Sequence, residues 1–221
     1  RRPIKKVAVS DIHLGNGTGK TSLKQYVKMI NGQNQDLMLI GGDLFDNSVI
    51  PLYAENMAEE LTELKAPLGI YMVPGNHEYI SGIDKSIQFM QNTPIQLLRD
   101  SVVTLPCGIQ LIGRDDRSNA RRLPLQKLMA RIDKSKPVIL LDHPPYQLAE
   151  SQAAGIDLQF SGHTHHGQVW PMNWVTDHLY EQSHGYRQWE NSHIYVSSGL
   201  SLWGPPFRIG TESEMVVLQL H

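Results

Sequence analysis

Aspartate and histidine stand two positions apart at one place in the chain, and two histidines repeat this spacing at another. Asp11 and His13 follow one short apolar run, and His163 and His165 follow a second. If the backbone is extended there, side chains two positions apart point to the same side, so each pair could share one metal ion. By itself an Asp-x-His pair is more often a turn-capping aspartate beside a structural histidine, whereas two imidazoles beside a glycine are better evidence for a metal.

Three further residues with metal-ligating side chains also follow apolar runs. Asp43 comes after two glycines, Asn76 after a Pro-Gly pair, and His143 before two prolines. Carboxylate oxygen, amide oxygen and imidazole nitrogen all bind divalent ions, although each residue alone could be a turn residue. Beside them, the His77 imidazole could give or take a proton, and Asp46 could cap the turn or orient that imidazole.

These residues carry more weight together than one at a time. Each follows an expected buried strand at its carboxyl end, which is the edge where open α/β sheets place ligand sites. Two aspartates, one asparagine and four histidines suffice for two ions that share a bridging carboxylate. The pattern therefore predicts a dinuclear metal site with the ligands Asp11, His13, Asp43, Asn76, His143, His163 and His165.

Short apolar runs and stretches with helical spacing alternate along much of the chain. We expect buried strands at residues 7–9, 37–40, 70–73, 138–141 and 158–160, and helices at residues 21–30, 52–64, 84–91 and 125–132. Such alternation predicts that part of the sheet structure is parallel.

Other stretches show a different pattern. We expect consecutive antiparallel strands at residues 95–98, 102–105 and 109–112, and further strands at residues 194–196 and 215–220. Residues 167–192 carry aromatic and polar residues without clear periodicity, and we interpret them as a long loop. The fold class that fits is α/β, a sandwich of two mixed β-sheets flanked by helices, rather than one doubly wound sheet.

The composition is that of an ordinary globular protein, and we place one domain at residues 1–221. A formal net charge of -2 gives no strong nucleic-acid signal, and a single cysteine excludes an intramolecular disulfide and any zinc site with two or more cysteines. No apolar run is long enough to span a bilayer. Because the chain starts at Arg1 without an initiator Met, an N-terminal anchoring or targeting segment could have been removed, so membrane association and localisation stay open.

The ordered motifs resemble those of the calcineurin-like metallophosphoesterases. The matching motifs, in order, are Asp11-x-His13, Gly42-Asp43-x-x-Asp46, Gly75-Asn76-His77-Glu78, His143 and Gly162-His163-x-His165. The later Gly167-Gln168 is similar to the bacterial branch of this family, although His166 stands where that branch commonly has glycine.

This resemblance implies a hydrolase of phosphate esters with the metallophosphoesterase fold. It would place one metal ion on Asp11, His13 and His165, a second on Asn76, His143 and His163, and Asp43 between them. His77 would face the leaving group and Asp46 would orient it. The resemblance favours Mn, with Fe or Zn as alternatives, and attack of a metal-bridging hydroxide on a phosphodiester or pyrophosphate.

The expected partner is a small phosphate ester, which could be lipid- or nucleotide-linked. Arg114, Arg117 and Asn76 could contact the substrate phosphate. We interpret the tryptophans of the late segments as packing residues in preference to a lipid- or base-binding surface; they are Trp170, Trp174, Trp189 and Trp203.

A nuclease of the same fold and a metal-binding, non-catalytic scaffold are the alternative functions. The near-neutral charge argues against the first, and the complete set of ligands argues against the second. The sequence does not distinguish a monoesterase from a diesterase, and it does not indicate the oligomeric state.

Overall fold

The computed structural model describes residues 3–220, and within them two β-sheets. The first sheet has the strand order β11-β1-β2-β3-β4, with β1 at Ile4–Val9, β2 at Leu37–Ile40, β3 at Ile70–Met72, β4 at Ile95–Leu97 and β11 at Val216–Leu220. Strands β1 to β4 are parallel, and β11 runs antiparallel beside β1.

The second sheet has the order β5-β6-β7-β8-β10-β9. Its strands are β5 (Ser101–Thr104), β6 (Gln110–Gly113), β7 (Val138–Leu141), β8 (Leu158–Ser161), β9 (Gly185–Trp189) and β10 (Ser192–Val196). The four central strands are parallel, and an antiparallel strand lies at each edge. Both sheets are therefore mixed.

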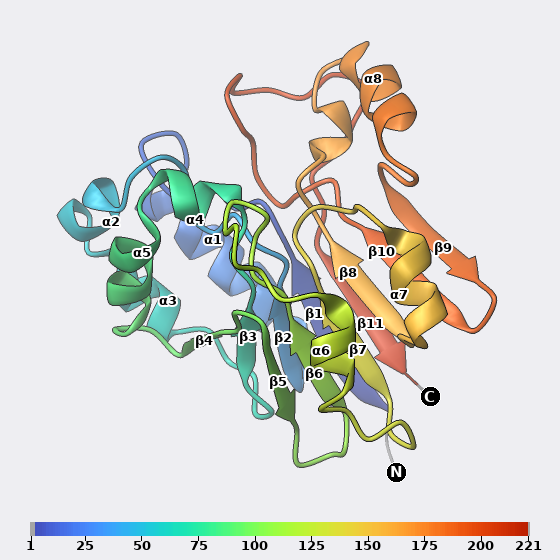
Figure 1. Ribbon diagram of the computed structural model, residues 1–221. Helices are drawn as coiled ribbons and strands as arrows, with labels where there is room; N and C mark the ends of the chain where they lie inside the picture. Colours follow the sequence, from blue (N-terminus) through green and yellow to red (C-terminus); the bar gives the residue numbers. More distant parts are fainter. Residues whose placement is uncertain (1–2, 221) are drawn as a thin grey trace.

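Alternating side chains of the strands fill three apolar layers. In β1, Ala8 faces the interior between the sheets, whereas Val7 and Val9 pack against helices on the outer face. Leu141 and Leu140 of β7 divide in the same way between the interior and the outer face of the second sheet. Figure 1 shows the two sheets packed together with helices outside them. This is the α/β sandwich that the sequence predicted.

Helices cover both outer faces of the sandwich. On the first sheet lie α1 (Lys20–Asn31), α2 (Ile50–Ala54), α3 (Met57–Thr62) and α5 (Ile83–Met90), and on the second lie α6 (Leu125–Met129) and α7 (Leu148–Ala154). The short helix α4 (Asn76–Ile80) begins directly after β3, and α8 (Met172–Leu179) projects beyond the sheets.

Three secondary-structure predictions were wrong. The helix expected at residues 52–64 is two short helices, because Asn56 between them has a left-handed backbone with φ 53°. Strand β4 is not part of an antiparallel series, since it pairs in parallel with β3 in the first sheet while β5 begins the second. The third error concerns residues 167–192, which contain α8 and β9 rather than a long loop.

No helix within residues 3–220 is long and apolar enough to cross a membrane. The expectation of an anchoring segment before Arg1 concerns residues outside that range and stays a prediction, as does the assignment of residues 1–221 to one domain.

Candidate functional site

The predicted ligands lie at the carboxyl ends of strands in both sheets. Asp11 follows β1 and Asp43 follows β2, while Asn76 opens α4 after β3. From the second sheet, His143 follows β7 and His163 follows β8. Since the parallel strands of the two sheets end at the same side of the sandwich, residues far apart in the sequence meet there.

One group of potential ligands is formed by Asp11, His13 and His165, all of them buried. The Nε2 atoms of the two histidines are 2.9 Å apart, and the Oδ1 atom of Asp11 lies 3.4 Å from His165 Nε2 and 3.9 Å from His13 Nε2. The three side chains thus direct their polar atoms at one point.

A second group is formed by Asp43, His143 and His163, with Asn76 beside them. His143 Nε2 lies 3.0 Å from Asp43 Oδ2, and His163 Nδ1 lies 3.3 Å from His143 Nε2 and 3.0 Å from Asn76 Oδ1. The structure therefore gathers all seven predicted ligands, six of them in two groups of three. These contacts place Asp43 in the second group, and its bridging role between the two ions stays a prediction.

The chemistry of these atoms fits metal ions. The Nδ1 atom of His143 is 2.7 Å from the Gly41 carbonyl oxygen, so that nitrogen carries the proton and donates. The Nε2 atom faces the Asp43 carboxylate, and two acceptors at this distance repel each other unless a proton or cation lies between them. Burial opposes the charged form of His143, but the Asp43 carboxylate outweighs burial and raises the pKa of His143 well above its usual value, so a proton lies there when no metal ion is bound. A metal ion would replace that proton, and an imidazole held by a carbonyl on its other nitrogen is the usual arrangement of a metal-binding histidine.

Burial keeps two of the imidazoles neutral. Burial lowers the pKa of His13 to about 3, although the carboxylates of Asp43 and Asp11 act against this. Burial, and then the nearby His143, lower the pKa of His163 to about 4. Both are therefore in the metal-binding form at neutral pH without losing a proton.

The backbone at the ligands is mostly left-handed. Positive φ angles occur at Asp11 (54°), His13 (49°), Asp43 (53°), His163 (75°) and His165 (49°). Non-glycine residues rarely adopt this conformation, and such residues cluster at functional sites where the surrounding structure enforces them. The prediction that Asp11 and His13 lie together because the chain is extended was right about their proximity and wrong about its cause.

Two glycines make room for the carboxylates. A Cβ atom at Gly75 would lie 2.1 Å from Asp43 Oδ1, and one at Gly162 would lie 2.3 Å from Asp11 Oδ2. Any larger residue at either position would displace a candidate ligand, so steric crowding explains why glycine occurs at these positions of the motifs.

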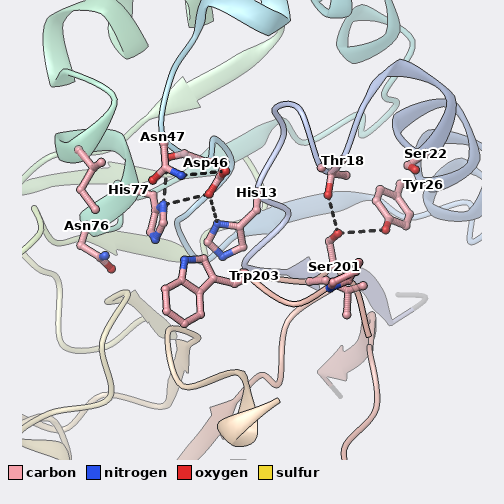
Figure 2. A pocket seen from close by; sticks show the side chains of 15 residues that line it. His13, Thr18, Ser22, Tyr26, Asp46, Asn47, Asn76, His77, Ser201 and Trp203 are labelled. Atoms are coloured by element: carbon pink, nitrogen blue, oxygen red, sulfur yellow. Dashed lines mark hydrogen bonds and ion pairs between the residues drawn. The ribbon is translucent and has the colours of Figure 1, made fainter. Parts of the chain in front are cut away.

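A cavity of about 670 Å³ opens beside these groups. It is lined by His13, Asn76, His77 and Asp46 on one side and by Trp203, whose ring centroid is 6.4 Å from that of His77, on another (Figure 2). A substrate that fills the cavity would touch His77, Asn76 and His13 of the first group.

The Asp46 residue holds His77 mainly through its backbone. The carbonyl oxygen of Asp46 lies 3.0 Å from His77 Nδ1, whereas its carboxylate Oδ1 is 3.5 Å away and is also 3.8 Å from His13 Nδ1. His13, Asp46 and His77 form a third group that could hold a cation. Two roles are therefore open to His77, that of a ligand and that of a proton donor.

Glu78 is a fully buried carboxylate whose importance the sequence patterns do not reveal. It accepts backbone N–H groups of Asp43 at 3.0 Å, Phe45 at 3.0 Å and Gly75 at 2.7 Å. Burial first, and the charge of Asp43 second, raise the pKa of Glu78 to about 8. Glu78 thus ties the turn after β2 to the turn after β3, and both turns carry ligands. The only sign of this role in the sequence is the position of Glu78 beside His77 in the motif.

We expect Glu78→Ala to lower the free energy of unfolding by at least about 3 kcal/mol, because three buried N–H groups would lose their acceptor at roughly 1–3 kcal/mol each. Chemical denaturation of the metal-free protein measures this. The exposed Glu63 on α3's end is the matched control, and Glu63→Ala should change stability little. Equal stabilities of the two variants would contradict this role of Glu78.

Arg208 is a second residue that the sequence does not single out. Its guanidinium donates to the carbonyl oxygens of His165 at 3.0 Å, Ser198 at 2.6 Å and Ser201 at 2.8 Å. It therefore connects the late glycine- and proline-rich segment to the 3-10 turn that carries His165 (η1, His165–Gly167).

Arg114 and Arg117, predicted to contact substrate, do not line the cavity beside His77. Arg114 is nearly buried and donates to the Leu123 carbonyl oxygen at 3.0 Å, whereas Arg117 is exposed. They line a separate hollow, which lies on the side of His143 and His163. Asn76 does line the cavity beside His77. The contacts with substrate that the sequence predicted for Arg114, Arg117 and Asn76 stay predictions.

Comparisons with known proteins agree with these motifs. A sequence model of the calcineurin-like phosphoesterase family matches residues 4–167. An uncharacterised metallophosphoesterase of Helicobacter pylori is 34% identical over 225 residues, which cover 99% of this chain and 60% of that protein. The UDP-2,3-diacylglucosamine pyrophosphatase LpxG of Chlamydia trachomatis is 24% identical over 260 residues, which cover 90% of this chain and 78% of that protein.

Among solved structures, a 5'-nucleotidase precursor of Thermus thermophilus shares the fold, with a TM-score of 0.56 and 14% identity over 99% of this chain and 55% of that one. The chain spans about 60% of the length of the Helicobacter relative. The match of the family model and the identity with the Helicobacter protein establish the family. The chain belongs to the calcineurin-like phosphoesterases, as its ordered motifs predicted.

Proposed function

We propose that this chain hydrolyses a phosphodiester or pyrophosphate with two divalent metal ions. The observation that carries the proposal is the convergence of seven Asp, Asn and His side chains, from both sheets, beside a cavity that also exposes His77. Two such ions supply charge that stabilises the phosphate oxygens and a water of lowered pKa. The mixed imidazole and oxygen donors admit Mn, Fe or Zn, and we take Mn as the first candidate because the resemblance to the family favours it.

In this proposal Asp11, His13 and His165 hold one ion and Asn76, His143 and His163 hold the other. Asp43 lies between them and accepts the backbone N–H of His77 at 2.9 Å. That hydrogen bond places the His77 backbone directly beside the metal site.

His77 would donate a proton to the leaving oxygen. Its Nδ1 faces the Asp46 carbonyl oxygen, which leaves Nε2 free for the cavity. A protonated His77 would donate through Nδ1 to the Asp46 carbonyl oxygen and through Nε2 to the substrate, and the Asp46 carboxylate oxygen Oδ1 lies 3.5 Å from Nδ1. Asp46 is then a positioning residue.

Turnover of bis-p-nitrophenyl phosphate by the purified chain tests the proposal. We expect hydrolysis with added Mn(II), none after chelation, and recovery when Mn(II) is restored. A protein that binds Mn(II) but hydrolyses no phosphoester would instead be a scaffold of this fold. Hydrolysis of single-stranded DNA in preference to small diesters would favour a nuclease.

The surface at the mouth of the cavity favours an amphiphilic substrate. Trp174 on α8 is 64% exposed and Trp203 is 51% exposed, contrary to the interpretation that these residues pack the late segments. The backbone of Trp170 donates to the Ile209 carbonyl oxygen at 2.8 Å, and Gln168 donates to the Trp203 carbonyl oxygen at 2.6 Å. The residues just before α8 are therefore joined to the segment around Trp203, and Figure 1 shows α8 projecting beyond the sheets.

We infer that this surface holds the apolar part of a lipid-linked phosphoester, or of the membrane that contains it. Exposed tryptophan is typical of surfaces that contact lipid at its polar boundary. The Chlamydia relative, which its name describes as acting on a diacylated nucleotide sugar, supports this substrate class.

We expect Trp174→Ala to raise KM about tenfold for a lipid pyrophosphate in mixed micelles, because truncating an exposed aromatic anchor typically costs more than about 1 kcal/mol. KM for bis-p-nitrophenyl phosphate should stay unchanged, since Trp174 does not line the cavity. Ile50→Ala, which removes an exposed apolar side chain of α2, is the control. An unchanged KM for the micellar lipid in Trp174→Ala would exclude this surface from substrate binding.

A further inference from the structure

A second hollow, of about 370 Å³, lies outside the cavity already described. Three of its lining residues are arginines, Arg114, Arg117 and Arg122, and none of the lining residues is acidic. Three guanidinium groups around one hollow attract an anion, since phosphate and carboxylate match their planar arrangement of donors.

The two inner arginines share one buried carboxylate. Both contact the same oxygen of Asp142, Oδ2, with Arg122 Nη2 making a short contact and Arg114 Nη1 at 3.4 Å. The side chains of Arg114 and Arg122 are 8% and 9% exposed. Two nearly buried positive charges therefore face a single negative one, and an uncompensated buried charge is strongly unfavourable.

Donor groups of both inner arginines are unused. Arg114 Nε and Arg122 Nη1 are buried and have no hydrogen-bond acceptor among the described residues. Asp100 and Glu150 act on Arg114 from a greater distance, but neither lines the hollow and neither makes an ion pair with these arginines within residues 3–220. Arg114 and Arg122 thus have N–H donors that an anion could accept from.

Arg117 is held at the rim of the hollow. Its Nη2 donates to Gln147 Oε1 at 2.6 Å, and its guanidinium lies over the Tyr146 ring, 4.6 Å from the centroid. Stacking on a ring leaves the edge of the guanidinium free for an anion. The third positive charge is therefore already positioned.

The hollow adjoins the candidate metal site. Asp142 directly precedes His143, and the Tyr146 ring stacks on Tyr180 with centroids 5.1 Å apart. Tyr180 in turn contacts His163 edge to face, with centroids 6.2 Å apart. The hollow therefore lies on the side of the second ligand group and is separate from the cavity beside Trp203, which is lined by His13 of the first group and by Asn76.

We propose that the hollow lined by Arg114, Arg117 and Arg122 is an anion site that binds a phosphate group. The group is either free phosphate or a second phosphate of the substrate, and the latter alternative rests on the proposed function. In both cases the anion supplies the negative charge that Asp142 alone does not.

Calorimetric titration of the Mn-loaded protein with inorganic phosphate tests the site itself. We expect a phosphate site that weakens about tenfold in Arg117→Gln, because a charge-assisted contact is lost. Arg121→Gln, equally exposed but outside the hollow, should behave as the wild type. Identical titrations of Arg117→Gln and Arg121→Gln would overturn the proposal, whether or not the metal site also binds phosphate.

Kinetics then distinguish the sources of the phosphate. If it belongs to the substrate, Arg117→Gln should raise KM about tenfold for a nucleoside diphosphate ester such as UDP-glucose and leave KM for bis-p-nitrophenyl phosphate unchanged. If it is free phosphate, both KM values stay unchanged while the calorimetric site weakens. Absence of any turnover in the wild type would disprove the proposed function and leave the calorimetric result valid.

Discussion

Asp43→Asn should lower kcat at least about a thousandfold and should lose its bound metal. Asp43 Oδ2 lies 3.0 Å from His143 Nε2, and the asparagine amide cannot supply the negative charge that a cation between these atoms requires. Metal ions contribute several kcal/mol of transition-state stabilisation, and each 1.4 kcal/mol is about tenfold in rate. The fold should persist, because asparagine has nearly the same shape.

Metal content by mass spectrometry and kcat on bis-p-nitrophenyl phosphate measure the two effects together. Asp84→Asn, at an exposed position of α5, is the matched control and should keep full metal content and activity. If Asp43→Asn retained two ions per chain and normal turnover, neither the ligand assignment nor the bridging role of Asp43 could stand.

His77→Ala should keep its metal and lose turnover by about 10²–10⁴-fold, which is the usual contribution of a general acid. The Nδ1 atom of His77 is held by the Asp46 carbonyl oxygen, and the rest of the ring faces the cavity beside Trp203. Removing the imidazole should therefore remove a proton donor without disturbing either ligand group.

Leaving-group dependence separates the two roles open to His77. An ester with a good leaving group, such as p-nitrophenol, needs little proton donation, so its turnover should fall less than that of an alkyl ester. His178→Ala, on exposed α8, is the control. Loss of metal in His77→Ala would instead assign His77 as a ligand, in the group that it forms with His13 and Asp46.

The strands, and the place of each candidate ligand at a strand end, could be predicted from the sequence because they depend on local patterns. A run such as Leu37–Ile40 is apolar throughout, as a strand buried on both faces must be, and the residue that follows its turn is placed by the strand itself. Parallel strands place Asp43 and His143 each at the carboxyl end of its own sheet. That the two residues meet depends on how the two sheets pack, which no local pattern predicts.

Elements set by tertiary contacts were missed. The pattern of residues 52–64 suits one helix, and only the left-handed Asn56 divides it. Helix α8 has no buried residue, so its sequence lacks the apolar stripe by which a packed helix is recognised. Glu78 and Arg208 act through hydrogen bonds to distant backbone groups, which no residue spacing encodes.

The candidate ligands come from two sheets, so metal ions bound to them would join the two sheets of the sandwich. Each bound ion favours the folded chain by mass action, so stability should follow the supply of metal in the surroundings. Packing between the sheets should in turn affect the metal site, since the Phe160 ring packs closely against Gly41, two residues before Asp43. A cell short of metal would then lose the protein to unfolding and degradation as well as its activity.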